Sequence, residues 1–266
     1  MRRFSEAYLS RTREGMWEDS RDALADLDLP GRERILDVGC GTGELSRILA
    51  EESDAEVVGV DADPALLEVA REAAGIPVVA GDARRLPVAD DAFDLVVCQA
   101  LLVNLPDPER AIEQFARVSS DLVAAVEPDN SAVDVRSTVS REQRLERRVR
   151  AAYLEGVETD VALGETVADR FEDVGLADVS TRRYYHRKEI EPPYSERSLR
   201  AATRKASGAG LADHERELRR ELADAEYDAI RSEWREMGRE VVEQMQAGDY
   251  RRIEVVPVDV TVGRVT

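Results

Sequence analysis

Lysine is almost missing from this chain of 266 residues: Lys188 and Lys205 are the only two among its 37 basic residues, and the rest are arginine. The 56 acidic residues outnumber them, giving a formal net charge of -19. Such charges repel one another at low ionic strength and are screened by salt. We interpret this composition as that of a halophilic protein. It also disfavours electrostatic attraction to nucleic acid or to an anionic membrane.

Cysteine and long apolar runs are scarce as well. Cys40 and Cys98 show no C-x-x-C spacing, so neither a disulfide framework nor a metal site is expected. No apolar run approaches the ~18 residues of a membrane span, and the N-terminal segment lacks the apolar region of a secretory signal. We therefore expect a cytoplasmic protein. The H-E-x-x-H, G-x-S-x-G and Walker-type patterns, each typical of a different enzyme class, are also missing.

Short apolar runs alternate with helical patterns through the first half of the chain. After a helical pattern at 5–27, runs typical of buried strands occupy 34–38, 56–61, 77–80, 93–98 and 122–126. This alternation indicates βαβ units and a parallel sheet, hence an α/β fold. The second half combines helical patterns at 140–154, 164–174, 195–206 and 211–246 with strand patterns at 179–190 and 253–265.

The segment between the first strand and its helix carries the clearest chemical signal. It reads Asp37-Val-Gly39-Cys-Gly41-Thr-Gly43. Glycines here let the backbone approach a ligand closely, and such a turn usually binds a nucleotide-type ligand at the carboxyl ends of the strands. A dinucleotide site needs G-x-G-x-x-G, but Glu44 or Ser46 occupies the third glycine position. The Glu44 carboxylate would also repel a pyrophosphate.

The same segment resembles motif I of the class I S-adenosylmethionine-dependent methyltransferases, and three further motifs follow in order. Val57–Asp61 is similar to the second motif, Gly81–Ala83 to the third, and Phe93–Cys98 with Leu105–Pro108 to the fourth. The resemblance covers residues 33 to about 128, roughly half of the chain. Within the family it points to the small-molecule type 11 subgroup, which includes quinone C-methyltransferases.

This resemblance implies a fold and a cofactor. The fold would be a Rossmann-like, mostly parallel sheet of seven strands with helices on both faces, the seventh strand running antiparallel. The cofactor would be S-adenosyl-L-methionine. Asp61 would accept its ribose hydroxyls, Asp82 the adenine amino group, and the Ala83 N–H would donate to the ring. The full implied cofactor-binding set is Asp37, Gly39, Gly41, Gly43, Asp61, Ala62, Asp82, Ala83 and Cys98.

The chain departs from the family pattern at two places. Val103-Asn104 stands where many relatives have His-His, and Ser119-Ser-Asp121 replaces a Lys-Pro-Gly-Gly turn. The first departure removes an obvious general base, so no catalytic residue is assigned. Because the cofactor is already activated, the protein mainly has to align the two partners and exclude water.

We expect one methyltransferase domain over residues 1–266, with a cofactor-binding core at 33–128 and helical cap insertions at 131–163 and 195–250. The second insertion is expected to act as a lid, because ligands sit outside the carboxyl ends of the strands. Its apolar stripe from Tyr227 to Met245 is of the kind that most often packs into a protein core. Tyr184, Tyr227 and Trp234 are the candidate substrate contacts.

Three functions stay open at this point. Methyl transfer to a small molecule leads, followed by methylation of RNA or protein and by a non-catalytic cofactor-binding module that regulates a partner. Residues 182–188 mix basic and aromatic side chains as RNA-binding surfaces do, although a strand would point them to opposite faces. The acceptor, its reacting atom, any base and the oligomeric state are not determined by these residues.

Overall fold

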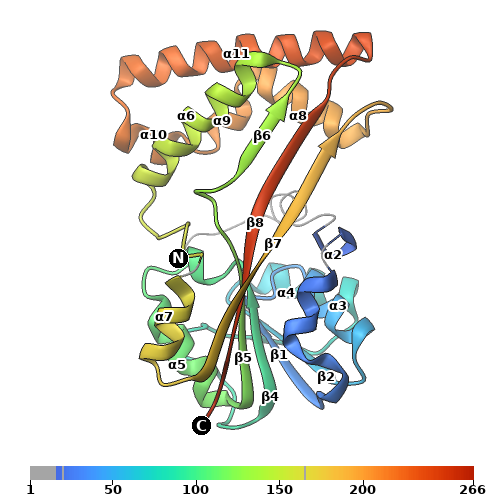
Figure 1. Cartoon of the computed structure of the whole chain (residues 1–266), viewed down its shortest axis with the longest axis vertical. Helices are drawn as coiled ribbons and strands as arrows, with labels where there is room; N and C mark the ends of the chain where they lie inside the picture. Colours follow the sequence, from blue (N-terminus) through green and yellow to red (C-terminus); the bar gives the residue numbers. More distant parts are fainter. Residues whose placement is uncertain (1–15, 20, 165) are drawn as a thin grey trace. The chain divides into compact units, whose positions relative to one another are not determined.

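The computed structural model describes residues 16–19, 21–164 and 166–266. The chain divides into two compact units. Figure 1 shows the ribbon coloured along the sequence. Unit 1 comprises Met1–Asp129, Thr159–His186 and Pro257–Thr266, and unit 2 comprises Asn130–Glu158 and Arg187–Val256. The expected insertions at 131–163 and 195–250 fall mostly in unit 2, which is a compact unit with a core of its own.

Unit 1 is built on a parallel sheet formed by the apolar runs of the first half of the chain. Its strands are β1 (Arg34–Val38), β2 (Glu56–Asp61), β3 (Val78–Ala80), β4 (Phe93–Gln99) and β5 (Ser119–Pro128). They lie in the order β3-β2-β1-β4-β5, all parallel. β8 (Arg252–Arg264) pairs antiparallel with β5, and β7 (Ala177–Ile190) pairs with β8. The expected Rossmann-like α/β fold with an antiparallel last strand is confirmed.

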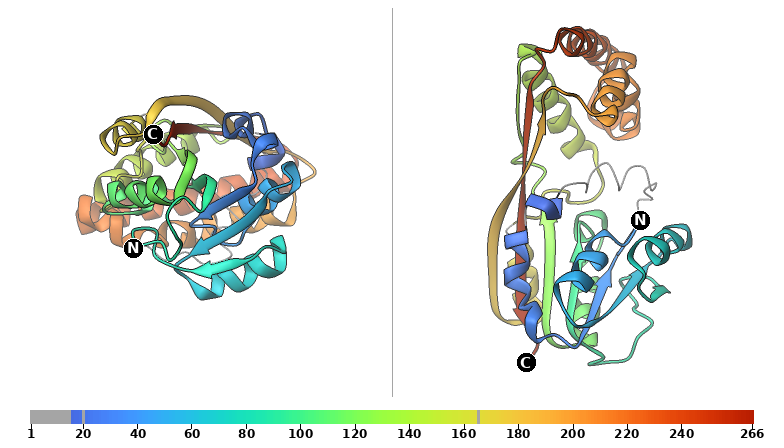
Figure 2. Two further views of the ribbon diagram at one scale, coloured as in Figure 1. Left: turned by 90° about the horizontal axis from the view of Figure 1, so that it is seen from below. Right: turned by 90° about the vertical axis from the view of Figure 1, so that its right-hand side faces the viewer.

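Helices cover both faces of this sheet because successive side chains on a strand point to opposite faces. The helices are α3 (Glu44–Glu52), α4 (Pro64–Ala74), α5 (Pro108–Val118) and α7 (Thr166–Asp173). Leu36 and Val38 of β1 share a buried cluster with Phe115 of α5 and Phe171 of α7. Leu67 and Ala70 of α4 pack with Cys40 in a separate cluster. Figure 1 and Figure 2 show the two groups of helices on either side of the strands.

The start of the described chain differs from the helix expected at 5–27. Residues 5–15 and Ser20 lie outside the described residues. The described part of this segment forms α2 (Met16–Asp19) and the 3₁₀ helix η1 (Arg21–Leu27), and the 3₁₀ helix η2 (Leu29–Gly31) follows. Leu24 and Leu27 are buried three positions apart. That spacing fits a 3₁₀ helix as well as an α-helix, so the apolar pattern could not separate them.

Unit 2 contains the helix expected at 140–154, the helices expected between the last two strands, and one strand that was not expected. They are β6 (Asp134–Ser137), α6 (Ser140–Gly156), α8 (Glu196–Ser207), α9 (Ala209–Ala212), α10 (Glu215–Glu221) and α11 (Asp224–Ala247). β6 pairs antiparallel with the beginning of β8. It has four residues and buries only Val135, which is too short a pattern to recognise as a strand.

The apolar stripe of α11 fills the core of unit 2. Tyr227, Trp234 and Met245 belong to one buried cluster with residues of α6 and α8. Gly238 lies where α8 and α11 touch, and a Cβ there would stand 2.3 Å from the backbone N of Ala206. No helix in the described part of the chain is long and apolar enough to cross a membrane.

Candidate cofactor site

The turn between β1 and α3 depends on its three glycines. Gly39, Gly41 and Gly43 all have positive φ, at 73°, 56° and 81°. A Cβ on Gly39 would come within 2.8 Å of the Leu101 side chain, and one on Gly43 within 3.0 Å of the Cβ of Ala70. Other residues would therefore strain this backbone and crowd its neighbours. The result is a tight turn at the carboxyl end of the parallel sheet in which three of the five residues from Gly39 to Gly43 have no side chain.

Asp61 is the last residue of β2, and its carboxylate forms a hydrogen bond to this turn. Its Oδ2 accepts the backbone N–H of Gly41 at 2.9 Å, and its Oδ1 accepts that of Asp63 at 2.8 Å. A carboxylate offers about four acceptor positions, so each oxygen keeps one for a further partner. Two vicinal hydroxyls of a ribose match that pair of free positions.

Asp82 follows β3, whose last residue Ala80 pairs with Asp61, so the two aspartates share one edge of the sheet. Arg84 binds the Asp82 carboxylate through its backbone N at 2.9 Å, its Nε at 3.1 Å and its Nη2 at 2.8 Å. The hydrogen bond from Arg84 holds the pKa of Asp82 below its usual range. Three acceptor positions are thus in use, and one is left for an amino group. Ala83 beside it is buried.

Asp37 and Cys98 lie at the ends of β1 and β4, with side chains inside the protein. Asp37 is 1% exposed and accepts a hydrogen bond from the Ser46 hydroxyl. Cys98 is fully buried, and burial raises the pKa of its thiol well above the usual value. Both side chains support the site from within, so a contact of Cys98 with a ligand would use its backbone. Ala62, beside Asp61, is exposed.

Glu127, near the end of β5, was not among the expected site residues. It is fully buried, and its Oε1 accepts the backbone N–H of Leu101 at 3.0 Å and of Leu102 at 2.9 Å. Its Oε2 accepts the N–H of Val103 at 3.3 Å. Burial raises the pKa of this carboxyl to about 7. The one sequence signal was a carboxylate directly after a strand of apolar residues.

The three candidate substrate contacts do not come together in one unit. Tyr184 belongs to unit 1, where its hydroxyl donates to Asp26 at 2.8 Å. Tyr227 and Trp234 belong to unit 2 and pack into its core, Tyr227 with no exposed surface. Core packing accounts for their helical spacing, and a contact with substrate stays a prediction. Among the described residues, no group of His, Cys, Asp and Glu side chains could hold a metal ion.

The sheet order, the antiparallel last strand, the glycine turn and the acidic residue ending β2 are those expected from the resemblance to class I S-adenosylmethionine-dependent methyltransferases. Residues 35–121 also match the family model described as a methyltransferase domain. The match is confined to this segment of the chain.

Relatives at the sequence level match over less than half of the chain. A 2-methyl-6-phytyl-1,4-hydroquinone methyltransferase of Oryza sativa subsp. japonica is 40% identical over 111 residues, covering 39% of this chain and 32% of the relative. A ubiquinone biosynthesis O-methyltransferase of Hahella chejuensis is 41% identical over 97 residues, covering 34% and 40%. The matched segment thus spans less than half of either relative.

At the structural level the likeness extends over nearly the whole chain. A Bacillus halodurans C-125 protein superposes with a TM-score of 0.53, covering 93% of this chain and 98% of the other at 17% identity. At that identity the likeness concerns the fold. It includes most of the part of the chain that the sequence relatives leave unmatched.

Proposed function

We propose that this protein transfers a methyl group from S-adenosylmethionine to a small-molecule acceptor. The observation that carries the proposal is the glycine turn at 39–43 with Asp61 and Asp82 on the same sheet edge. The relatives named for quinone substrates support a small acceptor. The excess of acidic residues supports it too, because a nucleic acid would be repelled.

In this proposal the residues of unit 1 bind and orient the cofactor, which supplies a methyl group on a sulfonium. Asp61 holds the two ribose hydroxyls, Asp82 accepts from the adenine amino group, and the Ala83 N–H donates to the ring. The turn at Gly39, Gly41 and Gly43 lets the backbone approach the rest of the cofactor. Alignment and exclusion of water then lower the barrier without a dedicated base.

The ligand preference is the first test. We expect S-adenosylhomocysteine to raise the melting temperature and NAD to leave it unchanged. Glu44 stands where the dinucleotide pattern needs a glycine, and its carboxylate in the first turn of α3 would repel a pyrophosphate. A thermal-shift comparison of both ligands at equal concentration measures this. Stabilisation by NAD alone would reverse the assignment.

The acceptor can be found by incubating the protein with radiolabelled S-adenosylmethionine and cell extract. Label in a small organic molecule is the expected outcome. Label in RNA or in protein would establish the second function in its place. Binding without any transfer of label would favour a regulatory cofactor-binding module.

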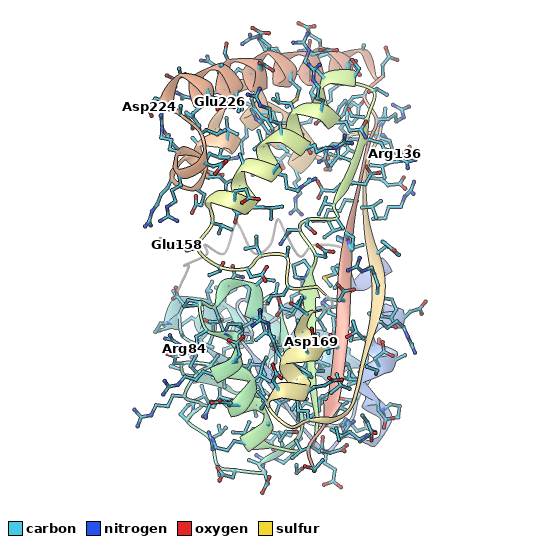
Figure 3. All side chains as sticks on the ribbon, turned by 60° about the vertical axis from the view of Figure 1, so that its left-hand side comes forward. Arg84, Arg136, Glu158, Asp169, Asp224 and Glu226 are labelled. Carbon is cyan, nitrogen blue, oxygen red and sulfur yellow. The ribbon has the colours of Figure 1, made fainter. Side chains whose placement is uncertain are left out.

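We propose in addition that the protein is cytoplasmic and adapted to high salt. Unit 1 contains about two acidic residues for each basic one, whereas the two kinds are nearly equal in number in unit 2. In unit 2 many charges are paired, among them Arg148–Glu226, Arg219–Asp224 and Arg220–Glu158, whose acidic partners are labelled in Figure 3.

This distribution predicts that salt stabilises unit 1 more than unit 2. The melting temperature of unit 1 should rise between ~0.1 M and ~2 M KCl, because screening weakens its repulsion. Each unit has one tryptophan, Trp17 in unit 1 and Trp234 in unit 2. Fluorescence of Trp234→Phe and Trp17→Phe variants therefore follows each unit by itself. A flat profile for Trp17 would contradict salt adaptation.

A further inference from the structure

The loop after β4 lies against the glycine turn and is held from inside by one carboxylate. Ala100 has a positive φ of 48°, and the 3₁₀ helix η3 (Leu102–Asn104) follows it. The Leu101 side chain is the group that a Cβ on Gly39 would strike. The position of this loop thus determines how the wall beside Gly39 is shaped.

Glu127 is the only described side chain that binds three successive amides of this loop. Leu101, Leu102 and Val103 direct their N–H groups at its two oxygens, at 3.0, 2.9 and 3.3 Å. These groups stand at the N-terminal end of η3, where backbone N–H groups have no partner inside the helix. A buried N–H without an acceptor is costly, and the fully buried carboxylate supplies the acceptors for all three amides.

We propose that Glu127 is a positioning residue: its carboxylate fixes the loop 100–104 against the glycine turn and thereby sets the affinity for the cofactor. The inference rests on the methyltransferase function proposed above. Because its oxygens are buried and occupied, Glu127 does not touch the substrate or the cofactor. It acts through Leu101.

The ionisation state of Glu127 should control this arrangement. An ionised carboxylate accepts at both oxygens, whereas a protonated one turns one oxygen into a donor facing the loop amides. Burial raises the pKa of Glu127 to about 7, although the hydrogen bonds from the loop amides and from the Cys98 thiol act to lower it. The Sγ atom of Cys98 lies 3.6 Å from Oε1. The charge of Asp37 acts on the same thiol. Among the described residues, no Arg or Lys forms an ion pair with Glu127, so protonation falls in an accessible pH range.

The stability contributed by Glu127 and the affinity for the cofactor should change in opposite directions as the pH rises. The folded pKa lies above the ordinary value of 4.5, so the stabilising contribution of protonated Glu127 is complete below pH 4.5 and is lost as the pH rises through about 7. Cofactor affinity should instead rise over the same interval, because the ionised form holds the loop. A residue needed only for stability would move both quantities in the same direction.

The test compares wild type, Glu127→Gln and the exposed control Glu113→Gln. Calorimetry with S-adenosylhomocysteine from pH 5.5 to 8.5 should show affinity rising roughly tenfold in wild type and in the control, the effect of one hydrogen bond to a charged group. Glu127→Gln should stay at the low-pH value throughout. Hydrogen exchange of the Leu101–Val103 amides, corrected for the intrinsic rate, should show matching loss of protection.

Two results would overturn the inference. One is protection of the Leu101–Val103 amides in wild type that does not change with pH, a measurement that needs neither a cofactor nor a variant. The other is S-adenosylhomocysteine affinity of Glu127→Gln that follows the wild-type pH profile. If wild type and control fail to bind S-adenosylhomocysteine at every pH, the proposed function fails with it. The exchange data then still show whether Glu127 holds the loop.

Discussion

Asp61→Ala should bind S-adenosylhomocysteine roughly 10- to 150-fold more weakly than wild type, the equivalent of ~1.5–3 kcal/mol for a hydrogen bond to a charged group. Two losses combine in this variant. The ribose hydroxyls lose their acceptor, and the N–H groups of Gly41 and Asp63 lose the oxygens that hold the glycine turn in place. Isothermal titration calorimetry measures the change directly.

Asp63→Ala is the matched control because it removes a carboxylate two residues away. The Asp63 side chain caps α4 by accepting the N–H of Ala65 at 3.0 Å. Its loss should cost about 1 kcal/mol of stability and leave the affinity nearly unchanged. Equal affinities of Asp61→Ala and wild type would remove Asp61 from the cofactor site. Equal weakening in both variants would mean that the effect comes from the fold of this segment.

The sequence predicted this part of the molecule well because local rules determine it. Apolar runs of four to six residues indicated the parallel strands, and parallel strands bring their carboxyl ends to one edge. The amino-acid pattern alone therefore places Asp61 and Asp82 together. The positive φ of Gly39, Gly41 and Gly43 follows from the same pattern, since glycine adopts it without strain.

What the sequence did not predict depends on contacts between distant segments. Glu127 meets Leu101 across 26 positions, and nothing local distinguishes it from an ordinary residue at a strand end. The pairing of β6 with β8 joins segments more than 100 residues apart. The apolar stripe of α11 was recognised correctly as a packing surface, but periodicity does not tell which core a helix fills. Its residues turned out to fill the core of unit 2.

Unit 2 also holds a group of buried charges that the composition alone would not suggest. Lys205 of α8 lies between two glutamates of α6, contacting Glu142 and, at 2.6 Å, Glu146. Arg252 donates to Glu146 at 2.8 Å, and the Tyr250 hydroxyl lies 3.0 Å from Glu142. Burial alone would raise the pKa of Glu146, but the charges of Lys205 and Arg252 lower it to about 2. The Glu146 carboxylate therefore depends on Lys205 and Arg252 to remain ionised inside the protein.

Lys205→Met should accordingly destabilise unit 2 by about 3–5 kcal/mol, the usual cost of leaving a buried charge without its partner. Methionine is unbranched and only one heavy atom shorter than lysine, so loss of packing is a minor part of this cost. The exposed pair Arg200–Glu196 provides the control, since Arg200→Met should change stability by less than about 1 kcal/mol. Denaturant unfolding in a Trp17→Phe background follows Trp234 and hence unit 2.

The pH dependence gives the same prediction an independent check. The folded pKa of Glu146 lies below the ordinary 4.5, so its contribution is complete above pH 4.5 and is lost as the pH falls towards 2. Wild-type unit 2 should lose stability over that interval, and Lys205→Met should lose less because one of the two cations is gone.

Lys205→Arg is informative because arginine fills almost every other basic position. A planar guanidinium cannot reproduce the compact ammonium between two carboxylates, so this variant should also lose stability. If Lys205→Met unfolds at the same denaturant concentration as Arg200→Met, the cluster contributes nothing beyond a surface ion pair.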